Sequence, residues 1–557
     1  MMRIPCMMFL LMVQIITTTA QISQGGFPEM NDADFNASSV MYLLEPENNI
    51  VVEGLKSTGY NTYKKGLHYA TERPVDLSPE FNGEWIEKDG MHIWRAHLVS
   101  PEAYSVGVLF SEFELNEGTR LFLYNPSGKF IKGGFTIENN KEFGSLYVGH
   151  IPGEEVIIEL QVDDPGRQYG KLRIGSISHA FLPVFAEKQV DASTLGTSQD
   201  CEIDVNCVEG EEWQTLKRSV CHISTISLLC SGALVNNTAY NGEPYILTAE
   251  HCINKDFYAA NSVFYFGYEN SDCGLADGTK DQSVSGAHLM ATGDSLDFSL
   301  VKLSSKPPRE YDVYYAGWDA REQGHASTVT LHHPNADVMK ISYDFDPTAE
   351  AVRLPGDLED YILESNYRIL EWDIGSTEGG SSGGPLFNSS KRIVGSLSGG
   401  LASCGDSIGY DAENDRVIYS LSKNRNDYFS KFHFNWNYYK ESSKQLKSWL
   451  DPTNSGQLAI GGLTQKFVDV ENKEAGDRSM IVYPNPSNGD FTLNLPYYSG
   501  NSAVIRIYDT IGRMVYNRSH HALYPVTITL PSVPSGIYLI RVTGDLMDMS
   551  GRIIISK

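Results

Sequence analysis

Residues 377–386 read TEGGSSGGPL, a stretch that holds four glycines and two serines. So much glycine and serine does not build a packed core, but it suits a tight loop whose backbone N–H groups converge on one point. Such a loop presents a nucleophilic hydroxyl, here Ser382, beside an oxyanion hole formed by the N–H groups of Gly380 and Ser382. For this stretch taken alone, a flexible glycine–serine turn is the alternative.

Two further segments carry side chains that can activate a serine hydroxyl. Residues 245–252 read YILTAEHC, an apolar run that leads to His251, and residues 295–303 read SLDFSLVKL, a strand pattern headed by Asp297. Taken singly, a histidine beside a cysteine is more often structural, and an aspartate before a strand is usually a turn residue. The occurrence of all three, in the order His251, Asp297, Ser382, argues against coincidence.

The three segments resemble the nucleophile, histidine and aspartate motifs of chymotrypsin-like serine proteases. Their order is the chymotrypsin order, whereas subtilisin and the α/β-hydrolases use other orders. The resemblance implies a mostly β fold with two packed β-barrels. It also implies that Ser382 is the nucleophile, that His251 is the general base, and that Asp297 orients the histidine.

One position departs from the pattern of that family. Most chymotrypsin relatives have an aspartate immediately before the catalytic serine, where it pairs with a newly cut N-terminus. This chain has Ser381 at that position. We therefore do not expect activation by insertion of a new N-terminus, and we expect a different interaction to shape the oxyanion loop.

Length, charge and the first residues indicate an exported protein of several domains. The 557 residues suggest three or four domains, and a hydrophobic content of 41% allows sizeable cores. The net charge of −26 argues against nucleic acid as a partner, because phosphates would be repelled. Residues 1–20 read as a signal peptide, with a positive Arg3 and an apolar run at 7–16 that is too short to span a bilayer. The sequence offers no other transmembrane candidate.

The cysteines cluster in the middle of the chain. Cys6 leaves with the signal peptide, and the other seven of the eight cysteines lie between residues 201 and 404. Clustered cysteines in an exported chain favour disulfides over a metal site, and neither a Cys-x-x-Cys pair nor a histidine-rich tract offers zinc spacing. Because seven is odd, we expect one free thiol.

Changes in pattern divide the rest of the chain. Residues 21–188 have short strand patterns separated by turn signals, which predict an antiparallel β-sandwich, and no catalytic constellation appears there. Residues 189–463 carry the three motifs and many strand patterns. They also contain a helix pattern at 442–450, which Asp451-Pro452 should end.

The C-terminal part has a different character. Residues 464–479 are charged and read as a linker, and residues 480–557 predict a small Ig-like β-sandwich. The segments YPNPSNG at 483–489, IYDTIGR at 507–513 and PSGIY at 534–538 resemble the C-terminal sorting domain of type IX secretion. The resemblance implies an export address read by the type IX secretion machinery, and hence a secreted or cell-surface protein. A carbohydrate-binding or adhesive β-module is the alternative.

The region with the three motifs has a closer resemblance, to bacterial lysyl endopeptidases. It covers residues 189–463 and is carried by CEIDVNCVEG at 201–210, AGWD at 316–319, HHPN at 332–335 and WLDP at 449–452. The pair His332-His333 could also indicate a metal site. Without a third ligand nearby in the sequence, we favour a structural turn.

The same resemblance implies a disulfide pattern. The family motifs pair Cys201 with Cys404, Cys207 with Cys273, and Cys230 with Cys252. Cys221 matches no family cysteine and is then the free thiol. Each unstrained bond contributes on the order of 2–4 kcal/mol, and the last one would fix the loop that carries His251.

The choice of substrate is also implied by the resemblance. Asp427, in NRNDY at 424–428, matches the acid at the base of the family's S1 pocket, where a buried carboxylate selects Lys or Arg. Read without the resemblance, it would be a surface turn residue. Trp372 matches the aromatic residue that flanks a histidine in this family, but Ser398 stands where the best-known form has that histidine. The strictness of Lys over Arg therefore stays open.

These observations predict a secreted, monomeric serine endopeptidase that cleaves protein or peptide substrates after lysine and needs no cofactor or metal. Residues 21–188 should be a propeptide that assists folding or masks the cleft. We expect its release by autocleavage after Lys188, with a mature N-terminus at Gln189. The alternatives are an Arg- or dual-specific protease, or a surface adhesin on an inactive protease fold.

Overall fold

The computed structural model forms two compact units, Met1–Gln465 and Lys466–Lys557. The expected signal peptide, the expected cut after Lys188 and most of the expected linker lie outside the described residues. Within the described part, no helix is both long and apolar enough to cross a membrane. The described residues are 26–29, 41–45, 64, 66–163, 166, 168–184, 198–275, 278–404, 407–411, 416–419, 426–465, 481–483, 487–494, 502–509, 513–521, 526–530, 533–544 and 547–555.

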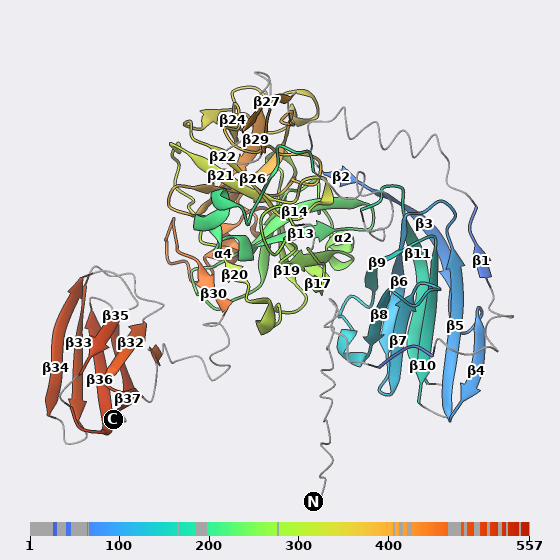
Figure 1. The fold of residues 1–557 in the computed structure, drawn as a ribbon, viewed down its shortest axis with the longest axis horizontal. Coiled ribbons are helices and arrows are strands. Elements are labelled where there is room, and N and C mark those ends of the chain that lie inside the picture. Colours follow the sequence, from blue (N-terminus) through green and yellow to red (C-terminus); the bar gives the residue numbers. More distant parts are fainter. Residues whose placement is uncertain are drawn as a thin grey trace, which may run out of the picture. The chain divides into compact units, whose positions relative to one another are not determined.

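The first unit begins with a β-sandwich (Figure 1). One sheet has the order β1-β5-β10-β7-β8 with β4 beside β5, and the other has the order β3-β11-β6-β9. Apolar residues from both sheets, such as Trp94, Phe110 and Leu160, form one buried cluster between them. The strands are β1 (Met41–Leu43), β3 (Ala70–Leu77), β4 (Glu84–Lys88), β5 (Met91–Val99), β6 (Ser105–Leu115), β7 (Thr119–Tyr124), β8 (Ile131–Phe135), β9 (Leu146–Pro152), β10 (Glu155–Val162) and β11 (Gly170–Ala180).

Two larger antiparallel sheets follow and form the two barrels of a chymotrypsin-like fold, as the sequence predicts. The first has the order β17-β16-β13-β14-β15-β19-β18, and the second β12-β22-β21-β25-β26-β29-β24-β23. The first sheet comprises β13 (Val220–Ser224), β14 (Leu228–Val235), β15 (Tyr245–Thr248), β16 (Val263–Phe266), β17 (Gln282–Ser285), β18 (Ala287–Gly293) and β19 (Phe298–Leu303). The second comprises β12 (Ile203–Asp204), β21 (Thr328–His332), β22 (Lys340–Asp344), β23 (Ala349–Glu350), β24 (Asn366–Ile369), β25 (Pro385–Asn388), β26 (Ile393–Gly400) and β29 (Asp427–Lys431).

The central strands of these sheets are apolar runs with both faces covered. Every residue of β14 (LLCSGALV) and of β26 (IVGSLSGG) is buried. A shared core of residues such as Leu247, Leu331 and Phe387 joins the two sheets. The catalytic motifs lie in loops at the ends of these strands, so the two sheets together fix their positions.

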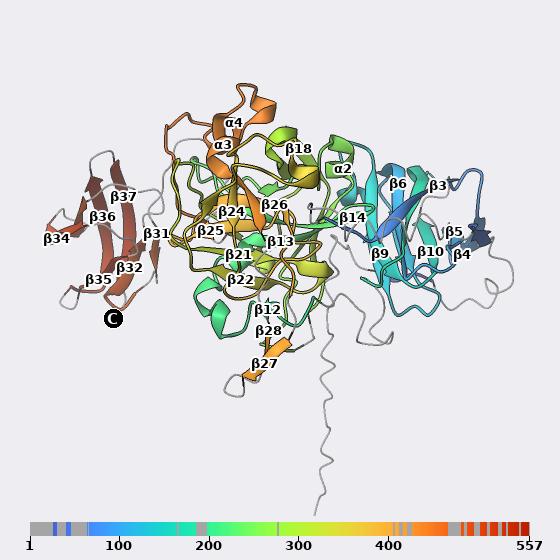
Figure 2. The same cartoon turned by 90° about the horizontal axis from the view of Figure 1, so that it is seen from above.

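Helices are few and short among the described residues of this unit. The expected helix at 442–450 is wrong in part: a 3-10 turn at Ser442–Lys444 and the helix α4 (Lys447–Leu450) are separated by Gln445, whose backbone is extended. Its neighbour α3 (Phe432–Asn437) accounts for the break, because the N–H of Leu446 donates to the carbonyl of Asn435 instead of continuing one helix. The two helices lie side by side (Figure 2).

The sandwich contacts the first barrel directly. The short strand β2 (Leu67–His68), which leads into β3, pairs antiparallel with β14 (Figure 1). Behind it, the hydroxyl of Tyr69 lies 2.9 Å from Nε2 of His150 and donates to the carbonyl of Thr225 at 2.9 Å. A buried cluster that includes Tyr147 of the sandwich and Tyr265 of the barrel extends this contact.

The second unit is a separate small β-sandwich. Its sheets have the orders β31-β32-β35 and β34-β33-β36-β37. Residues such as Leu493, Ile505, Ile540 and Ile553 fill the core between them. The strands are β31 (Ile481–Tyr483), β32 (Asp490–Asn494), β33 (Ser502–Asp509), β34 (Met514–His521), β35 (Val526–Thr529), β36 (Gly536–Gly544) and β37 (Met547–Ile555).

Candidate active site

The three motif residues meet between the two barrels. Nε2 of His251 lies 2.7 Å from Oγ of Ser382, and Nδ1 of His251 lies 2.9 Å from Oδ1 of Asp297. Because a carboxylate only accepts hydrogen bonds, Nδ1 must carry its proton and donate it. In neutral His251, Nε2 is then free to accept the proton of the Ser382 hydroxyl.

Asp297 is fully buried and held as a carboxylate. Burial alone would raise its pKa, but the nearby charge of His251, the hydrogen bond with that ring and a side-chain hydrogen bond from Ser398 outweigh it and lower the pKa. The backbone N–H of His251 also donates to Oδ1 at 3.1 Å. Ser398 therefore supports the carboxylate of Asp297. The sequence alone did not indicate this role, because it showed only that a serine stands where the best-known family form has a histidine.

The nucleophile loop is fixed by backbone contacts on both sides of Ser382. The N–H of Ser231 donates to the carbonyl of Ser382 at 2.8 Å, and the hydroxyl of Ser231 donates to the carbonyl of Gly380 at 2.9 Å. Gly383 has a φ of +80°, and a Cβ there would lie only 2.2 Å from Oγ1 of Thr248. Only glycine fits at that position.

A hydrogen-bond chain replaces the missing aspartate before the nucleophile. The backbone N–H of Glu378 donates to Oγ of Ser381 at 3.0 Å, and that oxygen lies 2.8 Å from Nδ1 of His332. Nε2 of His332 lies 3.2 Å from Oγ of Ser342, whose own proton is donated to the carbonyl of Ser376. Ser342 must therefore accept from Nε2–H, which leaves Nδ1 to accept from the Ser381 hydroxyl.

This series of hydrogen bonds gives His332 a structural role next to Ser382, the expected nucleophile. His332 is fully buried, and Oε2 of the buried Glu202 lies 3.8 Å from its Nε2. The neighbouring His333 is also buried, and its Nδ1 lies 3.0 Å from the carbonyl of Asp337. The two histidines thus serve the loop architecture, in line with the structural turn favoured from the sequence.

The expected oxyanion donors face no acceptor of the protein. Within the described part of the chain, the N–H groups of Gly380 and Ser382 donate to no protein acceptor, whereas that of Ser381 donates to the carbonyl of Glu378 at 3.1 Å. Gly380 has a φ of +95°, which turns the backbone at this point. Two N–H groups left unpaired beside a nucleophile can stabilise a developing oxyanion.

Asp427 lies in β29 as a fully buried carboxylate. Its Oδ2 accepts hydrogen bonds from the indole N–H of Trp372 at 2.8 Å and from the hydroxyl of Thr377 at 2.6 Å. The neighbouring strand β26 makes room for it at Gly400, where a Cβ would lie 2.1 Å from Oδ1. Trp372, which the resemblance places beside a histidine, here orients Asp427, and Thr377 links that acid to the nucleophile loop.

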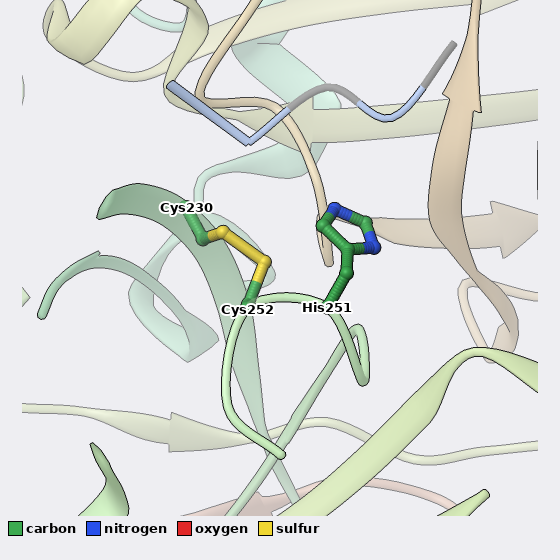
Figure 3. A group of neighbouring side chains, drawn as sticks. All are labelled: Cys230, His251 and Cys252. Carbon is green, nitrogen blue, oxygen red and sulfur yellow. A yellow bond between two sulfur atoms is a disulfide. The ribbon is translucent and has the colours of Figure 1, made fainter. Parts of the chain in front are cut away.

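The six cysteines bond as the resemblance implies. The disulfides are Cys201–Cys404, Cys207–Cys273 and Cys230–Cys252. The third lies beside His251 and ties its loop to β14 (Figure 3). Although both sulfurs and a ring nitrogen of His251 lie within 4.8 Å of one another, the bonded sulfurs are not thiolates, so this group is not a metal site.

Cys221 is a free, buried cysteine in β13. Burial raises the pKa of its thiol far above the ordinary value, which keeps the reactive thiolate scarce. A buried cysteine of this kind behaves as a small apolar side chain.

Comparisons with known proteins agree with this geometry. Residues 195–417 match the family described as lysyl endopeptidase, C-terminal domain. Residues 481–556 match the family described as secretion system C-terminal sorting domain. The protein is a serine endopeptidase, and its matched domain is similar to lysyl endopeptidases. Its sorting domain belongs to type IX secretion, so this endopeptidase is secreted or displayed at the cell surface, as the sequence predicts.

A curated relative extends the likeness of this endopeptidase beyond the matched domain. The lysyl endopeptidase of Pseudomonas aeruginosa is 26% identical over 392 residues, which cover 66% of this chain and 78% of the relative. Among solved structures, an inactive form of a protease from Mycobacterium tuberculosis is 16% identical with a TM-score of 0.26, over 42% of this chain and 91% of that one. A Glu endopeptidase in complex with MPD is 15% identical with a TM-score of 0.22, over 38% of this chain and 85% of that one.

Proposed function

We propose that this endopeptidase hydrolyses peptide bonds on the carboxyl side of lysine through an acyl-enzyme on Ser382. The observation that carries the proposal is the hydrogen-bonded chain from Asp297 through His251 to Ser382, with 2.9 Å and 2.7 Å between the bonded atoms. All three residues required for nucleophilic catalysis are present and in contact. This argues against an adhesin on an inactive protease fold.

The reaction begins with attack of Ser382 Oγ on the carbonyl carbon of the substrate. Nε2 of His251 takes the hydroxyl proton, and Asp297 stabilises the imidazolium that forms. The N–H groups of Gly380 and Ser382 receive the negative charge on the carbonyl oxygen. His251 then passes its proton to the leaving amine, and water releases the acyl group from Ser382 by the same steps in reverse.

Preference for lysine is supported by Asp427. A fully buried carboxylate held by the neutral donors Trp372 and Thr377 is best satisfied when a cationic side chain binds near it. The same charge repels an acidic side chain. An arginine could also pair with a carboxylate, and Ser398 stands where the best-known form has histidine, so dual Lys/Arg specificity is the second candidate.

Covalent labelling tests the central assignment. A fluorophosphonate probe should react with Ser382, and peptide mapping should locate the label there. Ser382→Ala should abolish labelling and lower kcat by about 10⁴-fold or more, while the neighbouring Ser381→Ala, a matched control, should still be labelled at Ser382. A label on Ser381 in the wild-type chain would refute the assignment.

A further inference from the structure

A second series of an acid, a histidine and a serine lies directly beside the candidate triad. Nδ1 of His332 lies 2.8 Å from Oγ of Ser381, and Nε2 of the same ring lies 3.8 Å from Oε2 of Glu202. The side chains of His332 and Glu202 have no exposed surface, and Ser381 is fully buried as well. Because a substrate cannot reach buried side chains, this series can act on catalysis only through the loop that carries Ser382.

Strand pairing in the second barrel places Glu202 beside His332. β12 pairs antiparallel with β22, with Asp204 opposite Lys340. β22 pairs in turn with β21, with Lys340 opposite His332. His332 is the last residue of β21, and Glu202 comes directly before β12. The acid and the histidine are therefore brought together by the sheet, although they lie far apart in the sequence.

Glu202 belongs to residues 198–204, near the beginning of the matched domain, which we call the start segment. The backbone of this segment is fixed on both sides of Glu202. The N–H of Glu202 donates to the carbonyl of Gln199 at 3.0 Å, the preceding Cys201 is bonded to Cys404, and the following residues form β12. A buried carboxylate costs several kcal/mol of desolvation, and these ties hold Glu202 in place despite that cost.

The start segment also contacts the nucleophile loop and the turn beneath it. Oγ of Ser198 donates to Oδ2 of Asp337 at 2.8 Å, in the turn that follows His332. The N–H of Gln199 donates to Oε1 of Glu378 at 3.2 Å, four residues before the candidate nucleophile. The start segment, the turn and the nucleophile loop are thus joined by hydrogen bonds.

The carboxylate of Glu202 can decide which nitrogen of His332 carries the proton. Oγ of Ser342 lies 3.2 Å from Nε2 and donates its own proton to the carbonyl of Ser376, so it accepts from Nε2–H. A negative charge 3.8 Å from Nε2 favours the same tautomer, because it attracts the positive end of the N–H dipole. Nδ1 then offers a lone pair to the hydroxyl of Ser381. The carboxylate of the candidate triad orients its own histidine in the same way.

We propose that Glu202 is a positioning residue for catalysis by Ser382. Its carboxylate fixes the tautomer of His332, which accepts from Ser381, and Ser381 keeps the neighbouring backbone N–H groups directed at the oxyanion. The proposal rests on the acyl-enzyme mechanism proposed above and does not depend on the preference for lysine. Because oxyanion donors act mainly on the transition state, loss of the charge at residue 202 should lower kcat and leave KM almost unchanged.

Steady-state kinetics of Glu202→Gln test the proposal, because glutamine keeps the shape of the side chain and removes its charge. Activity should be counted per site that a fluorophosphonate probe labels at completion, so that misfolded chains do not contribute. We expect kcat to fall by about 5- to 50-fold and KM to change by less than about twofold. Glu211→Gln is the matched control, since it removes an exposed charge nearby, and it should keep the wild-type kcat. An unchanged kcat in Glu202→Gln, or a loss that lies in KM, would overturn the proposal.

A double variant separates an effect that passes through Ser381 from a general effect on the fold. In Ser381→Ala the route from Glu202 to the loop is already broken, so adding Glu202→Gln should lower kcat by less than a further factor of about two. Losses that multiply in the double variant would mean that Glu202 acts by another route, and the proposal would be wrong.

The tautomer of His332 can also be measured without changing residue 202. Heteronuclear NMR of the Ser382→Ala chain, labelled in the ring nitrogens of its histidines, should show His332 protonated at Nε2, and a proton on Nδ1 instead would contradict the proposal. Its signal is assigned by its loss in His332→Gln. If the wild-type endopeptidase neither reacts with the probe at Ser382 nor hydrolyses a peptide, the proposed function itself fails. If it does both while Glu202→Gln has the wild-type kcat, only the positioning role is wrong.

Discussion

Nδ1 of His332 lies 2.8 Å from Oγ of Ser381, the residue immediately before the proposed nucleophile. Both side chains are fully buried. This hydrogen bond stands where most chymotrypsin relatives have an aspartate paired with a new N-terminus. The loop that carries Ser382 is therefore held by a hydrogen bond between two side chains of the uncut chain.

Ser381→Ala should accordingly slow catalysis without abolishing it. The variant loses the contacts of Ser381 with His332 and with the N–H of Glu378, and displacing an oxyanion donor by about 1 Å costs up to roughly 100-fold in rate. We expect kcat to fall by about 10- to 100-fold with KM little changed, since the loop acts on the transition state. Steady-state kinetics on a lysine peptide would show this, and an unchanged kcat would contradict it.

Asp427→Asn should remove the preference for lysine. A substrate ammonium buried without its partner charge costs about 3–5 kcal/mol, so kcat/KM on lysine peptides should fall by two or more powers of ten. Trp372→Phe is the matched control, because it removes one hydrogen bond to Asp427 and keeps the carboxylate. It should cost less and retain the lysine preference. Equal losses in both variants would mean that the charge of Asp427 is not what selects the substrate.

The contact between the sandwich and the first barrel should weaken as pH falls. Burial lowers the pKa of Lys280 to about 7 and that of Lys132 to about 8. The negative charge of Asp337 raises the pKa of Lys280, but by less than burial lowers it. Burial, with the nearby charges of both lysines, lowers the pKa of His150 well below its ordinary value.

Proton linkage gives the direction in which pH changes the stability of this contact. When the contact opens, these groups regain their ordinary pKa values, so the open state binds more protons than the closed state. Stability of the contact is fully present above pH 10.5, falls between 10.5 and about 7 through Lys280, and falls further below 6.5 through His150. Thermal unfolding of the Ser382→Ala chain at about pH 9 and about pH 6 should show a lower midpoint at the lower pH. When Lys132→Met is added, the difference between the two unfolding midpoints should be smaller. An unfolding midpoint of the Ser382→Ala chain that does not change with pH would contradict this prediction.

The second unit should be dispensable for catalysis, provided that the first unit is kept whole. Strand β30 (Leu463–Thr464) pairs with β20 (Tyr314–Tyr315), and the buried side chain of Gln465 accepts from the N–H of Val313 at 3.1 Å. A chain that ends after Gln465 should keep full peptidase activity. One that ends after Leu463, the boundary expected from the sequence, should be less stable by about 1–3 kcal/mol, since it loses two or more hydrogen bonds. Loss of activity in the longer form would make the second unit part of the enzyme.

Local patterns in the sequence were enough to predict the fold class and to identify the three residues of the candidate triad. Each motif is a short run with its own signal: glycine and serine around Ser382, and apolar strands that end at His251 or begin after Asp297. Strands such as β36 and β10 were likewise visible as apolar runs between turn residues. The helix at 442–450 was wrong in part, because periodicity does not reveal that α3 takes over a backbone hydrogen bond at Leu446.

The missed features all depend on contacts between distant residues. The hydrogen bond between His332 and Ser381 joins positions that are 49 residues apart, and no sequence pattern near either residue predicts it. From the sequence, Ser398 was noted only as the residue that replaces a histidine of the best-known family form, whereas in the structure its side chain forms a hydrogen bond with Asp297. The sequence of β2 carries no motif either, and its pairing with β14 appears only in the structure.

Peptide mapping of one denatured test protein is the most direct test of the central claim. The test protein should be digested with the active wild-type endopeptidase and, in parallel, with the Ser382→Ala chain, and every new C-terminus should be identified by mass spectrometry. We expect the wild-type digest to end at lysine and the Ser382→Ala digest to contain no new termini. Cleavage after residues other than lysine would contradict the assigned specificity, and equal cleavage by both chains would contradict catalysis by Ser382.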